Sequence, residues 1–254
     1  MPGWVELQSY LLILVRIASF MVTAPVFSIR TTPTYLKIGL STIIAFLLFP
    51  VVGQGQLIPQ GMGNFIYMVI LEVVVGLALG FAAALAFTAI RVAGELIDLH
   101  VGFSMASLLD PHTGSGTTLV GRFLYILAIL LFLALDGHHS LLLALGGSFD
   151  LIPLGGAVLN KEIATEVISF FTSMFLLGFK IAAPFMAVVI LTDISLSLVS
   201  RTVPQINVFI MGFPLKAGLG IFVLIIIMPL FLAAVNGIIS QMEQDLMIII
   251  RGFM

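Results

Sequence analysis

The sequence predicts an all-α membrane protein with about six hydrophobic segments. Two observations carry this prediction: 61% of the 254 residues are hydrophobic, and only 9% are charged. A water-soluble domain usually has roughly 25% charged residues and about 45–50% apolar ones. Because so little polar surface is available, we expect the chain to lie in a bilayer, where each spanning helix needs about 20 apolar residues.

The hydrophobic segments follow one another with short, turn-rich pieces between them. The first has no basic region ahead of it, so we interpret it as a retained span and not as a cleaved signal. We see no fixed-period repeat and no hydrophilic linker, so we expect a single integral membrane domain over 1–254. In order, the segments cover 7–27, 36–53, 65–90, 121–146, 163–192 and 215–241.

Basic residues flank the odd-numbered loops between these segments. The first, third and fifth loops are each bracketed by two Arg or Lys residues, the second has none, and the fourth has only Lys161. Basic loops stay on the cytoplasmic side of a membrane. If all six segments cross, the odd loops are cytoplasmic and both termini lie on the opposite side.

Several segments carry a charge or small residues where a simple lipid-facing helix would have neither. Glu72 lies in the third segment and Lys180 near the centre of the fifth. A charge at mid-bilayer costs about 2.5–3.5 kcal/mol. Lys180 therefore reaches the membrane surface or pairs with a nearby acid, or its segment is buried in an assembly. Gly76 and Gly80 allow two helix backbones to approach closely, within the chain or between subunits.

No catalytic, cofactor or metal site is predicted, and we do not expect an enzyme. Cysteine is absent, which excludes disulfides and thiolate chemistry, and the four histidines lack a metal-binding spacing. Glu95 and Asp98 are three residues apart on a predicted helix, where two acids form a proton or cation site or a solvated stripe. The net charge of −2, without a basic run, predicts no binding of nucleic acid.

Three stretches together resemble one known family. They are VRIASFMVTAPVFSIRTTPTYLKIGLS at 15–41, AGELIDLHVGFSMASLLDPHTG at 93–114 and VPQINVFIMGFPLKAGLG at 203–220. The chain resembles the FliR family, the export-gate subunits of the flagellar type III secretion apparatus. A paralogous virulence (injectisome) family has the same architecture, and the sequence only partly separates the two.

The resemblance implies a structural and gating subunit that serves flagellar assembly. It would work in the bacterial inner membrane, in the flagellar basal body, as one copy in a gate with FliP-like and FliQ-like subunits and an FlhB-like switch protein. That gate passes unfolded export substrates, and its helices form tilted hairpins packed in a helical assembly. A secondary transporter of small solutes and an intramembrane enzyme are the alternatives.

The resemblance also implies that the loop at about 103–121 projects into the channel as a plug. Proline disfavours helix at the residue before it, glycine lets the loop bend, and bulky apolar groups in a narrow pore exclude water. The other interpretation is a helix cap that packs on its neighbours. The expected plug residues are Phe103, Met105, Leu108, Leu109, Asp110 and Pro111, with hinges at Gly102, Gly114 and Gly116.

The third stretch is interpreted as a contact for a neighbouring gate subunit or for the switch protein. Its prolines would bound an amphipathic piece, and an asparagine would satisfy backbone groups freed by the break. A re-entrant turn held by the prolines is the other interpretation. The residues concerned are Pro204, Asn207, Phe209, Pro214 and Lys216.

Overall fold

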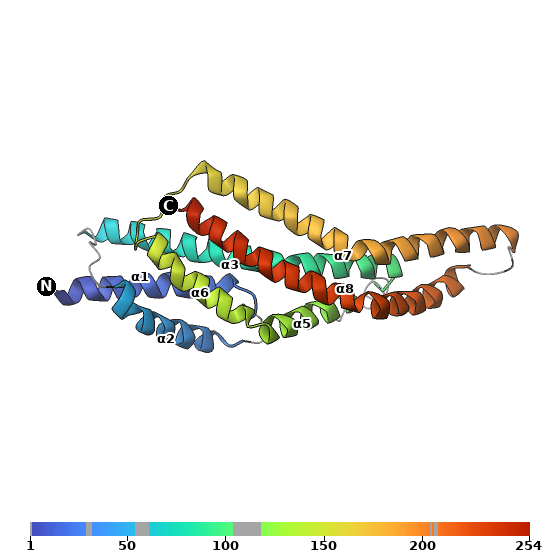
Figure 1. Cartoon of the computed structure of the whole chain (residues 1–254), viewed down its shortest axis with the longest axis horizontal. Helices are drawn as coiled ribbons and strands as arrows, with labels where there is room; N and C mark the ends of the chain where they lie inside the picture. The colour runs from blue at the N-terminus through green and yellow to red at the C-terminus, as the bar shows by residue number, and fades with distance from the viewer. Residues whose placement is uncertain (1, 29–31, 54–60, 104–117, 204, 206–207) are drawn as a thin grey trace. The chain divides into compact units, whose positions relative to one another are not determined.

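The computed structural model describes residues 2–28, 32–53, 61–103, 118–203, 205 and 208–254, and every regular element in them is a helix. The prediction of an all-α membrane protein is confirmed. Five helices are long and apolar enough to cross a membrane, or six if the bent pair α5 and α6 is one span. In order, the helices are α1 (Pro2–Thr23), α2 (Thr34–Val52), α3 (Met62–Val101), α5 (Leu119–Ala134), α6 (Gly137–Leu151), α7 (Lys161–Thr202) and α8 (Val208–Gly252) (Figure 1).

The helices α3, α7 and α8 extend well beyond the apolar segments that the sequence predicts. The third segment was expected to end at 90, but α3 continues to Val101. The charge at Arg91 does not end the helix, because its side chain is exposed and its Cζ atom lies 4.6 Å from the centre of the Tyr125 ring. Counting apolar residues therefore marks the hydrophobic part of a helix and not its ends.

The predicted fourth segment is two helices and not one. The break falls between α5 and α6, where Asp136 adopts a left-handed backbone conformation with φ of 56°. Aspartate enters this region more readily than most residues. The amide N–H groups of His139 and Ser140 then bond the Asp136 carbonyl oxygen at 2.9 and 3.3 Å, which starts α6.

Prolines do not end the long helices. Pro184 lies inside α7, and Pro214 and Pro229 lie inside α8. The expectation that Pro214 bounds a separate amphipathic piece is therefore wrong. Prolines are tolerated in membrane helices when neighbouring helices, side chains or local backbone adjustments satisfy the freed groups.

The chain divides into two compact units. The first unit comprises Met1–Ala86, Leu133–Phe171 and Ile239–Met254, and the second comprises Phe87–Phe132 and Thr172–Ile238. The long helices α3, α7 and α8 each contribute one part to each unit. The expectations of one membrane domain and of tilted hairpins in a larger assembly stay predictions.

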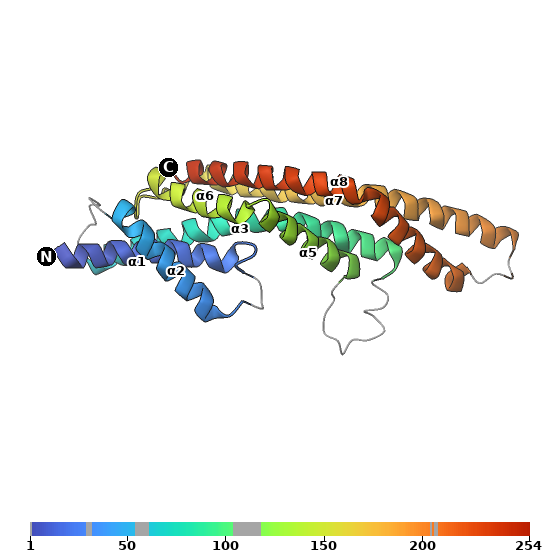
Figure 2. The ribbon, with the colours of Figure 1, turned by 60° about the horizontal axis from the view of Figure 1, so that its bottom comes forward.

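In the first unit, α1 packs directly on the beginning of α3 (Figure 2). Gly76 and Gly80 make this close contact. A Cβ atom at Gly76 would lie 2.0 Å from the Ser19 Oγ atom, and one at Gly80 would lie 2.0 Å from the Thr23 Oγ1 atom. These glycines therefore serve helix packing inside the chain. On its other side α1 contacts α2, where the Tyr10 and Phe49 rings meet edge to face at 6.0 Å.

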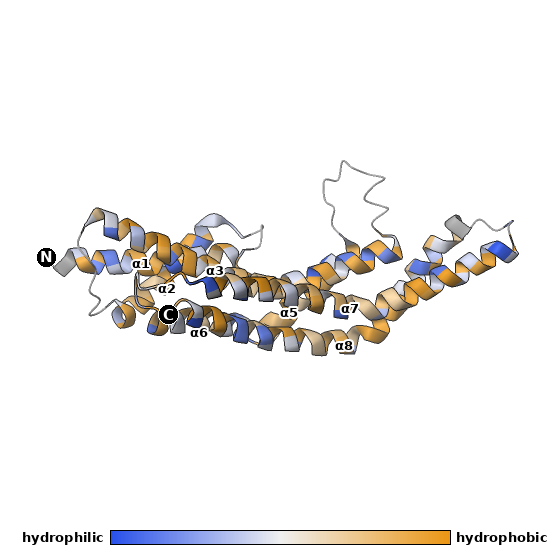
Figure 3. Cartoon of the chain, turned by 90° about the horizontal axis from the view of Figure 1, so that it is seen from above, coloured by the Kyte–Doolittle hydropathy of each residue, from blue (hydrophilic) through white to orange (hydrophobic). Residues whose placement is uncertain are grey.

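In the second unit, the end of α3 packs on α5. A Cβ atom at Gly94 would lie 2.1 Å from the Gly121 Cα atom, so the two backbones are in contact and neither position can carry a larger side chain unchanged. Further along the same pair of helices, the Phe87 ring lies edge to face with Phe132, at 5.1 Å between centroids. Hydrophobic residues, in orange, dominate the helices in Figure 3.

Candidate functional site

A fully buried ion pair joins α1 to α3 in the first unit. Arg16 is 0% exposed and Glu72 is 1% exposed. The Arg16 Nε atom lies 2.5 Å from Glu72 Oε2, and Nη2 lies 3.1 Å from Oε1, so the guanidinium binds the carboxylate through two parallel hydrogen bonds. This bidentate geometry is among the strongest side-chain contacts available to arginine.

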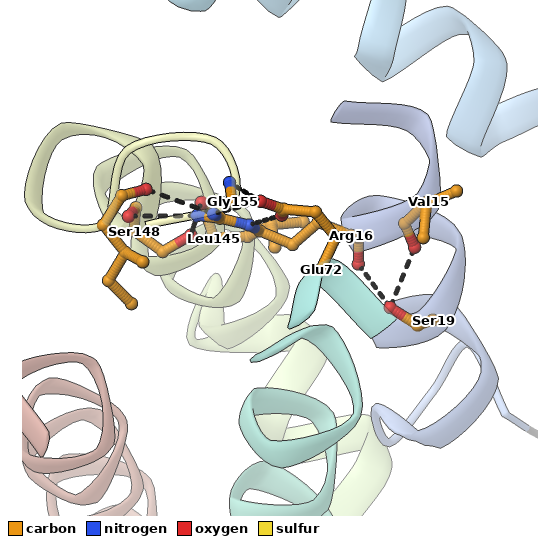
Figure 4. A network of polar contacts seen from close by, with 8 residues as sticks. Val15, Arg16, Ser19, Glu72, Leu145, Ser148 and Gly155 are labelled. Carbon is orange, nitrogen blue, oxygen red and sulfur yellow. Dashed lines mark hydrogen bonds and ion pairs between the residues drawn. The ribbon is translucent and has the colours of Figure 1, made fainter. Parts of the chain in front are cut away.

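The remaining N–H groups of Arg16 bind the end of α6 (Figure 4). Nη1 donates to the Ser148 carbonyl oxygen at 3.1 Å and to Ser148 Oγ at 3.2 Å, and Nη2 donates to the Ile152 carbonyl oxygen at 3.1 Å. A guanidinium has five N–H donors, and all five have an acceptor here. A cation at the C-terminus of a helix is also favoured by the helix dipole.

Glu72 is held from its other side by the loop that follows α6. The Gly155 amide donates to Glu72 Oε1 at 2.8 Å. Gly155 has φ of +68°, and a Cβ atom there would lie 2.3 Å from the Met68 Cε atom. Both the backbone conformation and the packing therefore require glycine at this position.

This network is a structural clamp and not a reaction centre. Its two charged groups compensate each other, and every donor of the guanidinium is occupied. A buried charge without a partner would cost several kcal/mol. The pair therefore fixes α1, α3 and the end of α6 in one arrangement, one turn away from the close contact at Gly76.

A second buried carboxylate holds the start of α5 in the second unit. Asp98 is 0% exposed, and its two oxygen atoms accept hydrogen bonds from the Val120 and Gly121 amides, each at 3.1 Å. The Thr118 side chain also hydrogen-bonds this carboxylate. The first N–H groups of a helix have no partner within the helix. Asp98 of α3 supplies hydrogen-bond acceptors for two of these N–H groups. Its negative charge at the N-terminus of α5 is also favoured by the helix dipole.

Asp98 therefore has a different environment from Glu95, the acid three residues before it that the sequence predicts to lie on the same helix face. Glu95 is exposed, whereas Asp98 is fully buried and bonded to backbone. The two acids do not form one site on the described chain. Within the described residues, no group of three His, Asp or Glu side chains is placed to hold a metal ion.

The two conspicuous motifs of the sequence meet in the second unit. The Phe103 ring, in GFS, lies edge to face with the Phe213 ring, in GFP, with 6.3 Å between centroids. Gly102 has φ of +96°, and a Cβ atom there would lie 3.3 Å from Phe213 Cδ2. A Cβ atom at Gly220 would similarly lie 3.1 Å from Val101 Cγ2. The end of α3 is thus seated on the beginning of α8.

The structure describes some of the other predicted site residues. Lys216 pairs with Asp193 of α7, Lys180 is exposed on α7, and Pro214 is exposed on α8, the helix that also contains Phe209. Nine predicted residues lie outside the described residues: Met105, Leu108, Leu109, Asp110, Pro111, Gly114, Gly116, Pro204 and Asn207. The roles assigned to all these residues stay predictions.

Sequence reasoning missed the central role of Arg16 and the capping role of Asp98. A signal for the first was present: Arg16 interrupts LLILVRIASF, and Glu72 interrupts YMVILEVVVG, so two opposite charges lie inside predicted spans. Such charges are expensive in a membrane unless they are paired. Pairing them with each other would have been a reasonable prediction, but nothing in the sequence marks the end of α6 as the third partner.

Comparison with known proteins places the chain in a family. Residues 7–242 match the model of "Bacterial export proteins, family 1". The flagellar biosynthetic protein FliR of Bacillus subtilis (strain 168) is 34% identical over 235 residues, which cover 91% of this chain and 90% of the relative. The chain belongs to the FliR family of bacterial export proteins.

Two further family members support the same assignment. The FliR protein of Escherichia coli (strain K12) is 32% identical over 239 residues, covering 94% of this chain and 90% of the relative. The FliR protein of Aquifex aeolicus (strain VF5) is 30% identical over 218 residues, which cover 85% of this chain and 83% of the relative. The match to the family model includes Arg16, Glu72 and Asp98, so both buried carboxylates lie in the part shared with the family.

We predict that Arg16→Met strongly destabilises the protein. The change leaves the Glu72 carboxylate buried without its cation, at a cost of about 3–5 kcal/mol. The measurement is the midpoint of thermal unfolding of the detergent-solubilised protein. Arg201→Met, which removes an exposed arginine at the end of α7, is the control and should change the midpoint little. Equal midpoints for the two variants would contradict the clamp.

We predict that Asp98→Ala loosens the start of α5. The Val120 and Gly121 amides lose their acceptor, which costs about 1–3 kcal/mol for buried groups. Hydrogen–deuterium exchange of the peptide covering 118–124 should become faster. Glu95→Ala, an exposed acid on the same helix, should leave this exchange unchanged. If the exchange in the Asp98→Ala variant is as slow as in the wild type, the carboxylate does not hold the start of α5.

Proposed function

We propose that this chain is a structural and gating subunit of the flagellar protein export channel in the bacterial inner membrane. The family match over residues 7–242 carries this proposal, because it spans both units and its relatives bear the name "Flagellar biosynthetic protein FliR". The apolar helices agree with a place in the membrane. A secondary transporter of small solutes has no comparable support.

The chain acts without catalysis in this proposal. The buried charged groups among the described residues, Arg16, Glu72 and Asp98, are all bonded inside the protein and serve packing. We propose FliP-like and FliQ-like subunits and an FlhB-like switch protein as its partners, and unfolded export substrates as the passing chains. Large exposed apolar side chains on α7 and α8 support a role in a membrane assembly.

We further propose that the loop at about 103–121 is a plug of the channel. The described residues on both sides of its centre support this. On one side Gly102 and Phe103 pack on Phe213, and on the other side Asp98 holds the first turn of α5. The chain is therefore held by packing on one side of the proposed plug and by hydrogen bonds on the other.

The experiment that tests this function uses a strain in which the gene for this chain is deleted. We expect loss of flagellar filaments and of secretion of flagellar subunits, both restored by the full chain. A chain lacking 104–116 should still assemble but should make the membrane permeable to ions or small solutes. The strain without the chain should not leak, because no channel is assembled there.

Two results would contradict the proposal. Normal filaments in the deletion strain would exclude a role in flagellar export. Unchanged permeability with an assembled chain lacking 104–116 would exclude a plug while leaving the export role intact.

A further inference from the structure

Lys180 occupies an unusual position on α7. It is exposed, and it forms no ion pair with any residue that the structure describes. Along the helix its nearest charged residues are Glu166, 14 positions before it, and Asp193, 13 positions after it. At 1.5 Å per residue, roughly 20 Å of helix separates Lys180 from each of them.

Lys180 interrupts the apolar part of a helix that is long and apolar enough to cross a membrane. The helix from Ile163 to Thr202 is a candidate membrane span, and a bilayer core is about 30 Å thick. The stretch from 167 to 192 contains no charged residue except Lys180. A lysine side chain has a four-carbon stem, which is short compared with the roughly 20 Å of helix that separates Lys180 from either charged residue. A charge in such an apolar stretch is costly in a membrane or in an apolar contact between helices unless it is paired.

The surface around Lys180 is apolar and exposed. One turn before it, Leu176 is 53% exposed, and further along the same face Ala187 is exposed and Leu191 is 64% exposed. Ala183 and Ala187 follow Lys180 at helical spacing, and small residues of this kind let a second membrane helix approach closely. The face thus combines exposed apolar side chains, two small residues and one positive charge that has no ion-pair partner among the described residues.

We propose that this face of α7 binds a membrane helix of a neighbouring subunit that carries an aspartate or glutamate, and that Lys180 forms a buried ion pair with that carboxylate. Charge complementarity identifies this partner, because lipid chains offer no acceptor and the protein side chains that are negatively charged near pH 7 are those of aspartate and glutamate. The proposal rests on the proposed function, since it requires the chain to assemble with other membrane subunits.

The test compares variants of the full chain, expressed with the proposed gate subunits and isolated from membranes. The amount of co-purified subunit is measured per amount of this chain, so a change in expression does not affect the result. We expect Lys180→Glu and Lys180→Met to lower this ratio by at least about tenfold, because either change leaves the partner carboxylate buried without its cation. Lys180→Arg should keep the ratio within about twofold.

Two controls make this result specific. Lys161→Glu reverses an exposed lysine at the start of the same helix, outside the uncharged stretch, and should leave the ratio unchanged. In the second control, one acidic residue in a membrane span of a co-expressed subunit is replaced by lysine. This change should restore binding of the Lys180→Glu chain. The natural chain has no cysteine, so a photocrosslinker attached to Ala187→Cys should also label that subunit.

The outcomes separate this inference from the function on which it rests. A wild-type ratio for Lys180→Met would mean that the lysine faces lipid or water, and would overturn the proposal. Loss of binding that no intramembrane charge reversal restores would also overturn it, because Lys180 would then act within its own chain. Neither result touches the export role, which fails only if the deletion strain still assembles filaments.

Discussion

The arrangement of the first unit depends on the buried pair of Arg16 and Glu72. A membrane protein cannot leave either group unpaired in an apolar interior, so the two helices that carry them must come together in one register. The same guanidinium bonds the carbonyl groups of Ser148 and Ile152 at the end of α6. One side chain therefore fixes three helices, and the glycines at 76 and 80 then let α1 and α3 pack closely.

The second unit uses the same principle at a helix start. Asp98 is buried because it supplies hydrogen-bond acceptors to the first turn of α5, and the contact between Gly94 and Gly121 brings the two helices close enough for these bonds. The packing of Phe103 on Phe213 then joins the GFS motif to the GFP motif. Two motifs about 110 positions apart in the sequence thus belong to one packed region.

The sequence predicted the fold class, because composition alone requires a membrane and a membrane allows only helices or closed barrels. It predicted both ends of α2 to within two residues, with 36–53 expected and Thr34–Val52 observed. The sequence changes abruptly from polar to apolar residues at these ends. It could not predict that Asp136 breaks the fourth segment, since the apolar pattern continues across the break. It identified Gly76 and Gly80 as packing residues but not α1 as their partner, because a single sequence does not show which distant positions meet.

The central claim is that Arg16 and Glu72 stabilise the protein as a pair, and a double-mutant cycle tests it most directly. The free energy of unfolding in detergent is measured for the wild type, Arg16→Met, Glu72→Met and the double variant. We expect each single change to be more destabilising than the double change, with a coupling energy of about 3 kcal/mol, because the double variant leaves no charge buried alone. Additive effects of the two single changes would contradict the claim.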